Sequence, residues 1–234
     1  MIWKIPEMWK GGECWIIGGG PSVPRMFGVP ESVIESVQNK VATLGAYSPY
    51  LSALHDKHVI GVNTAYLYGD WVDVVVFGDS QFYLEHAKRL LNFKGIKVSS
   101  HPRVHSRHPG IYHIKFTPLD TSHPVGLTDK RGHVSWNKHS GSGAINLAYH
   151  FGAKRIYLLG FDMKLDVNGK SHSHAEYFRE GLPKFGKNLP YDRHLAAYPK
   201  IAADAERLGL EIINVNDDSA ITQFPIVTNI KEVL

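Results

Sequence analysis

The sequence has almost no cysteine and no long apolar run. Cys14 is the only cysteine among 234 residues, which excludes an internal disulfide and a cluster of thiolate metal ligands. No apolar stretch approaches the roughly 20 residues that cross a bilayer. The opening segment MIWKIPEMWKGG lacks the continuous apolar core of a signal peptide. We therefore expect a cytoplasmic protein without a membrane span.

The composition is that of an ordinary globular protein. Hydrophobic residues make up 43% of the chain and charged residues 21%. The length fits one sizeable domain, which we assign to residues 1–234. A net charge of +4 suits an anionic ligand or a nucleic acid, although charge spread over the surface gives the same total. The chain also has 14 histidines, an unusual number.

Short apolar runs alternate with helical patterns along the chain. Apolar residues recur at helical spacing over 83–91, 144–151 and 195–208. The other runs are almost continuously apolar, which is typical of strands buried on both faces. They are residues 14–17, 58–63, 72–79, 155–162 and 210–216, with weaker candidates at 96–100 and 112–116. This alternation predicts an α/β protein with a Rossmann-like open, mostly parallel sheet and helices on both faces.

Three long stretches show neither a strong helical nor a strand period. They are residues 24–57, 101–139 and 163–193. Stretches this long in a compact domain are commonly lids or binding loops, and we assign all three as lid or insert segments.

Small polar residues follow the predicted strands, at what would be their carboxyl ends. In an open parallel sheet these ends meet at one edge, where ligands bind. Glycine amides approach a phosphate closely, and Asn or Asp side chains bind ribose and base edges, although the same residues also form turns and caps. The set predicts a nucleotide site. Its members are Gly18, Gly19, Gly20, Pro21 and Ser22, then Asn63, Asp79, Asp162, Asn214 and Asn216, with Ser140 as the expected cap of a helix.

The glycine turn differs from two common nucleotide motifs. Gly18 and Gly20 begin a G-x-G-x-x-G pattern, but Val23 stands where the third glycine belongs and Pro24 follows. No Gly-Lys-Ser/Thr follows either. The turn therefore argues against a standard NAD enzyme and against a P-loop ATPase.

Four stretches resemble the bacterial lipo-oligosaccharide sialyltransferases and, more distantly, the archaeal 6-hydroxymethylpterin diphosphokinase-like proteins. They are IIGGGPSV, VIGVNTAY, SGSGAINLAYHFGAKRIYLLGFD and YDRHLAAY, in the family order from residue 14 to about 220. The strongest part runs from Ser140 to Asp162. The resemblance implies a Rossmann-like site and a nucleotide-dependent transferase with a nucleotide-activated donor, a CMP-sugar or similar.

The resemblance also implies roles for individual residues. The nucleotide would be held by Gly18 to Ser22, by Asn63 and by Ser140-Gly141. His194 would be the general base on the acceptor hydroxyl, with Tyr191 or Tyr177 stabilising the leaving phosphate. An ordinary imidazole pKa near 6.5 suits that task at neutral pH.

Two positions depart from the sialyltransferase pattern. Gly19 stands where the family has Asn between its glycines, and Asp79 stands where it has Asn. An acidic group at position 79, together with Asp162, would suit Mg²⁺ and a diphosphokinase. A magnesium-dependent diphosphokinase is therefore one alternative, and a non-catalytic nucleotide-binding module is another.

The remaining features leave further alternatives open. His172 and His174 alternate on an extended segment, and would belong either to an acceptor-site lid, to a transition-metal site or to a solvated loop. The acceptor is left open among a glycan, a small molecule and a modified nucleic acid base. A homo-oligomer is also left open.

Overall fold

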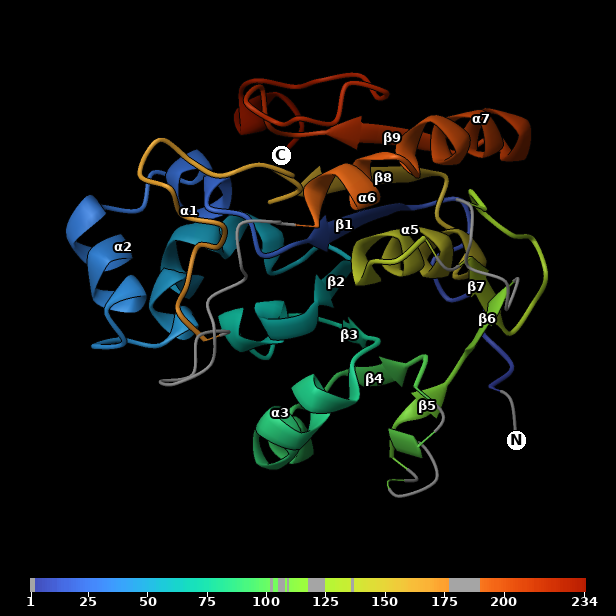
Figure 1. Ribbon diagram of the computed structural model, residues 1–234, viewed down its shortest axis with the longest axis horizontal. Helices are drawn as coiled ribbons and strands as arrows, with labels where there is room; N and C mark the ends of the chain where they lie inside the picture. The colour runs from blue at the N-terminus through green and yellow to red at the C-terminus, as the bar shows by residue number, and fades with distance from the viewer. Residues whose placement is uncertain are drawn as a thin grey trace.

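The apolar runs form the strands of one parallel sheet, whose order is β5-β4-β3-β2-β1-β8-β9 (Figure 1). The computed structural model describes residues 3–101, 103–104, 108, 110–117, 125–135, 137–176 and 190–234. The strands are β1 (Glu13–Ile17), β2 (Val59–Val62), β3 (Val74–Phe77), β4 (Ile96–Ser99), β5 (Tyr112–His113), β8 (Arg155–Leu159) and β9 (Glu211–Asn214). The predicted Rossmann-like α/β class is confirmed.

The strand order reverses at β1. From β1 the chain adds β2 to β5 on one side, and it then returns to place β8 and β9 on the other side. Ile17, the last residue of β1, is in register with Gly61 of β2 and with Leu159 of β8. Ligands of open α/β sheets bind at such a reversal, outside the carboxyl ends of the strands. The topology therefore points to the turns after β1 and β8.

Helices cover both faces of the sheet because its strands are apolar on both faces. In β1, Cys14 and Ile16 face one hydrophobic cluster, whereas Trp15 and Ile17 face the other. The first cluster includes side chains of α5 (Ser140–His150) and α7 (Tyr198–Leu208). The second includes side chains of α1 (Ser22–Met26), α2 (Glu31–Gln38), η1 (Leu44–Leu54), η2 (Asn63–Tyr68) and α3 (Ser80–Asn92). Figure 1 shows these two layers.

Residues 24–57 are not the irregular loop that the sequence suggested. They contain α2 and the 3-10 helix η1, and Ile34, Val37, Leu51 and Leu54 are buried against the sheet. The prediction missed η1 because 3-10 geometry repeats every three residues and Pro49 interrupts the pattern. This stretch is part of the core.

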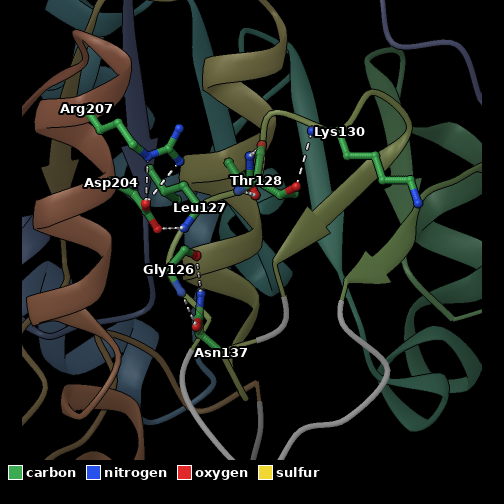
Figure 2. Close-up of polar contacts among 8 residues, drawn as sticks. Gly126, Leu127, Thr128, Lys130, Asn137, Asp204 and Arg207 are labelled. Atoms are coloured by element: carbon green, nitrogen blue, oxygen red, sulfur yellow. Dashed lines mark hydrogen bonds and ion pairs between the residues drawn. The ribbon is translucent and has the colours of Figure 1, made fainter.

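Part of the second stretch is also fixed. The strand β6 (Lys115–Thr117) pairs in parallel with β7 (His133–Ser135). Asn137 accepts from the N–H of Gly126 at 3.2 Å and donates to the Gly126 carbonyl at 2.8 Å, two contacts that are drawn as dashed lines in Figure 2. The N–H of Leu127 donates to Asp204 of α7 at 2.9 Å. Gly126, Leu127 and Asn137 are therefore held by contacts with one another and with α7.

Within the described part of the third stretch, residues 163–176 form no helix or strand, and the short helix α6 (Tyr191–Leu195) begins near its end. Near the end of the chain lies the 3-10 helix η3 (Ile230–Glu232). In the part of the chain that the structure describes, no helix has the length and apolar character needed to cross a membrane.

Candidate functional site

A cavity of about 320 Å³ lies at the carboxyl ends of β1, β2 and β8. Its walls come from the turns after these strands, from the amino terminus of α5 and from α6. The sequence-predicted residues that line it are Gly18, Gly19, Gly20, Asn63, Ser140, Gly141, Asp162, Tyr191 and His194. The fold thus gathers residues from five separate parts of the sequence at one site.

Two glycines of the first turn are required by packing between turns. A Cβ added at Gly18 would lie 2.6 Å from the carbonyl oxygen of Gly160, and one at Gly20 would be equally close to it. The N–H of Gly18 donates to Leu159 and that of Gly20 donates to Gly160, at 2.7 and 3.0 Å. The N–H groups of Gly18 and Gly20 thus have partners within the protein, which differs from the expectation that the glycine amides approach a phosphate. Gly19 lies outside this pairing.

Asp162 ties together the ends of three strands. Its buried carboxylate accepts from the N–H of Ser22 at 3.0 Å and also from the Ser22 hydroxyl. It accepts from Nδ2 of Asn216, beyond β9, at 2.6 Å. Burial raises the pKa of Asp162, and the hydrogen bonds from Ser22 and Asn216 oppose that rise. These contacts give Asp162 a role in holding the turns together.

The amino terminus of α5 is capped by His139. The sequence had suggested Ser140 as the cap. Nδ1 of His139 accepts from the N–H of Ser142 at 3.1 Å, and Ser142 Oγ donates to the His139 carbonyl at 2.9 Å. Ser140 is the first residue of the helix. Gly141 follows, where a Cβ would lie 2.7 Å from the ring of Phe161. Gly141 therefore presents only backbone to the cavity.

His194 lies in α6 and lines the cavity beside His139, their ring centroids 4.9 Å apart. Burial lowers the pKa of His194 to about 4, and the charge of Arg193 adds to this lowering. A hydrogen bond to the backbone carbonyl of Lys138 raises the pKa. The expectation of an ordinary pKa near 6.5 is therefore not met. Burial raises the pKa of Tyr191, and the charge of Asp162 adds to this, so its phenol stays protonated.

His172 and His174 lie on a strap, residues 171–176, that crosses the glycine turn. The N–H of Ser173 donates to the Gly19 carbonyl at 2.9 Å, and the Tyr47 hydroxyl donates to the Ser173 carbonyl at 2.9 Å. Nε2 of His174 lies 2.8 Å from Oγ1 of Thr64. Only His172 of the pair lines the cavity. Burial lowers the pKa of both rings, to about 4 for His172.

The other predicted residues lie elsewhere. Asp79 caps α3 by accepting from the N–H of Gln81 at 2.8 Å, and it is not among the residues that line the cavity. Pro21 and Ser22 line a separate hollow of about 230 Å³. The side chain of Asn214 is buried and donates to the Ile221 carbonyl. Tyr177 lies outside the described residues.

No metal site is formed by the described part of the chain, where no three His, Cys, Asp or Glu side chains are placed to hold an ion. Asp79 is used as a helix cap, and both carboxylate oxygens of Asp162 have protein donors. These residues do not fit a magnesium site.

Several residues that line the cavity were not among the predicted site residues. His139, Phe161 and Arg193 are three of them. Each is adjacent in sequence to a predicted residue, namely Ser140, Asp162 and His194. Adjacency was the available signal, but the direction of each side chain depends on the packing of α5, β8 and α6.

No protein-family model matches the sequence, and comparison with curated proteins gives no match. Solved structures do share the fold. The MAf glycosyltransferase from Magnetospirillum magneticum AMB-1 aligns with a TM-score of 0.59 at 14% identity, over 100% of this chain and 36% of that chain. This chain thus spans about a third of the length of that protein.

The sialyltransferase CstII from Campylobacter jejuni, in complex with CMP-3FNeuAc, aligns with a TM-score of 0.50 at 12% identity, over 93% of this chain and 86% of that chain. At these identities both likenesses concern the fold.

Proposed function

We propose that the cavity binds a nucleotide-activated donor, a CMP-sugar or similar, and that the chain is a glycosyltransferase-like enzyme. The observation that carries this proposal is that His194 lines the same cavity as the glycine turn and the amino terminus of α5. A helix amino terminus favours a phosphate, and a neutral imidazole beside it can accept a proton. A module that only binds nucleotides would have no need of a base at that place.

The fold supports the same proposal. The sheet order and the position of the cavity agree with binding at a topological switch point. The MAf protein is a glycosyltransferase, and the CstII structure holds a CMP-sugar analogue. From the likeness in fold we extend the nucleotide-sugar donor to this chain as a proposal.

The tautomer of His194 suits a general base. One ring nitrogen donates to the Lys138 carbonyl, so in the neutral ring the other nitrogen carries a lone pair. In the proposed step the acceptor oxygen attacks the anomeric carbon, and the bond from that carbon to the donor phosphate oxygen breaks. The nucleotide leaves with the electron pair, and His194 takes the hydroxyl proton.

We further propose that two neighbours of His194 assist the leaving nucleotide. Arg193 is a cation at the cavity wall, and Tyr191 supplies a phenol whose pKa is raised by burial. A positive charge and an O–H donor both stabilise negative charge that develops on a phosphate. We assign Tyr191 and Arg193 to this role.

The diphosphokinase alternative has no supporting observation in the described residues. Its two candidate metal ligands, Asp79 and Asp162, serve as a helix cap and as a link between turns. We therefore write the transfer without a metal ion.

The test uses donor hydrolysis, because water replaces an unknown acceptor. A thermal-shift screen of CMP, UDP, GDP, ADP and ATP, with and without Mg²⁺, identifies the nucleotide, since a ligand of the native state raises the melting temperature. Release of that nucleotide from its sugar donor is then followed. His194→Ala should lower turnover by about 10² or more with donor affinity retained.

The matched control is His58→Ala. His58 is a half-exposed histidine that precedes β2, at the opposite end of the sheet from the cavity, so turnover should be unchanged. Full turnover in His194→Ala, or no binding of any nucleotide, would reject the proposed function.

A further inference from the structure

His139 carries a hydrogen-bond donor that the folded protein does not use. Its Nε2 atom is buried and has no hydrogen-bond partner among the described residues. Buried polar atoms nearly always have a partner, so an exception of this kind calls for an explanation. The ring lines the cavity, so a bound ligand is a candidate for the missing partner.

The helix cap determines where the ring proton sits. Nδ1 accepts from the N–H of Ser142, so it needs its lone pair, and a neutral ring then carries its proton on Nε2. Protonating Nδ1 as well would break the cap. Burial lowers the pKa of His139 to about 3, and the nearby His194 and Arg193 act in the same direction. His139 is therefore a neutral Nε2–H donor at any ordinary pH.

The surroundings of this donor favour an anionic oxygen. Ser140 and Gly141 begin α5 directly after His139, and the amino terminus of a helix carries a partial positive charge. Arg193 lines the same cavity. Nε2 is shielded from water in the empty protein, so a ligand oxygen reaches it only when a neighbouring ring such as that of His194 moves, and the bond then forms away from bulk solvent.

We propose that the Nε2–H of His139 binds a phosphate oxygen of the nucleotide donor at the amino terminus of α5. This inference rests on the proposed function, because it assigns the phosphate to a nucleotide. The inference gives the two histidines different roles. His139 only donates a hydrogen bond, whereas His194 accepts a proton.

Two substitutions separate the cap from the donor. His139→Asn keeps an oxygen that can accept from Ser142, as Asn is among the preferred capping residues, but it has no group that reaches as far as Nε2. His139→Gln extends an amide N–H to about the reach of Nε2 and weakens the cap. We expect the Gln variant to melt a few degrees below wild type and the Asn variant to melt close to it.

Binding is measured by calorimetry with CMP and cytidine, which differ only in the phosphate. We expect His139→Asn to weaken CMP binding by about tenfold or more, as is typical for loss of one hydrogen bond to a charged group, and to leave cytidine binding unchanged. His139→Gln should recover most of the CMP affinity. An unchanged ratio of CMP to cytidine affinity in His139→Asn would overturn the proposal.

Imidazole ¹⁵N NMR gives a second readout that does not depend on the nucleotide. Wild type should show the Nε2–H tautomer at His139, and inorganic pyrophosphate should shift that resonance while His58 stays unmoved. An Nδ1–H tautomer, or no response to pyrophosphate and CMP, would also overturn it. If pyrophosphate acts on His139 but no nucleotide binds, the phosphate site stands and the proposed function fails.

Discussion

The ring of His172 occupies the space that a side chain at Gly19 would need. A Cβ built at Gly19 would lie 2.8 Å from Cδ2 of His172. The two residues are 153 positions apart in the chain, and the bond from Ser173 N–H to the Gly19 carbonyl keeps them together. Position 19 is therefore glycine because the strap at 171–176 lies against it.

Gly19→Ala should be destabilising only while His172 is present. The added methyl group forces the ring away, and overpacking of this kind costs about 1–3 kcal/mol of unfolding free energy. In a His172→Ala background the cost should fall by at least about 0.5 kcal/mol, because the space has been vacated. Denaturant unfolding of the four proteins measures this coupling. Gly110→Ala, where a Cβ would meet nothing within 4 Å, is the control. Strict additivity would contradict the account.

The rate of donor hydrolysis should persist to low pH. His194 must be neutral to accept a proton, and its pKa in the empty protein is lowered to about 4. The acidic limb of kcat/KM reports the free enzyme, so it should fall near pH 4 and not near 6.5. Rates from pH 3.5 to 8 test this, with circular dichroism to verify folding. A limb near 6.5 that survives in His194→Ala would show that another group is titrating.

Asp162→Asn should lower stability because the amide turns one acceptor into a donor that faces Ser22 and Asn216. A buried donor or acceptor left without its partner costs about 1–3 kcal/mol. Asp218→Asn is the matched control, since Asp218 pairs with Lys164 at the surface, where such pairs contribute about 0–1 kcal/mol. Chemical denaturation compares the two variants. Equal effects would mean that Asp162 does not link the turns.

Stability should fall as the pH drops below about 6.5. Burial lowers the native pKa of His139 to about 3 and of His150 and His172 to about 4. Histidines in the unfolded chain titrate near pH 6.5. Between pH 6.5 and 4 they bind protons there, whereas the same histidines in the native state do not. Each buried histidine then costs about 1 kcal/mol at pH 5.5. Unfolding free energies at pH 7.5 and 5.5 measure this, and equal values would contradict it.

Asp79 should matter as a helix cap. Asp79→Ala is expected to lower the unfolding free energy by about 1 kcal/mol, whereas Asp79→Asn should be nearly silent because Asn also caps well. Donor hydrolysis by wild type should be the same in EDTA and in Mg²⁺. Loss of a magnesium-dependent activity in Asp79→Asn would instead favour the diphosphokinase alternative.

The sequence by itself determined the parallel sheet and which turns meet at its carboxyl edge. Strands such as 14–17 and 155–162 can be predicted from the local sequence, because burial on both faces of a sheet requires a continuous apolar run. Once the sheet is parallel, its carboxyl ends must meet, so Gly19, Asn63 and Ser140 are predicted to be neighbours without knowledge of a single contact. Both predictions rest on short-range patterns that the chain shows directly.

Only the tertiary structure decided what each residue at that edge does. His139 is a cap with an unused N–H, and Asp162 is a link between turns, because of partners that approach in space. The helix η1 within 24–57 was hidden by a 3-10 period and a proline. The pKa of His194 depends on its burial beside His139 and Lys138, which lie more than fifty positions away in the sequence. Such properties arise from contacts between distant segments, and no local pattern encodes them.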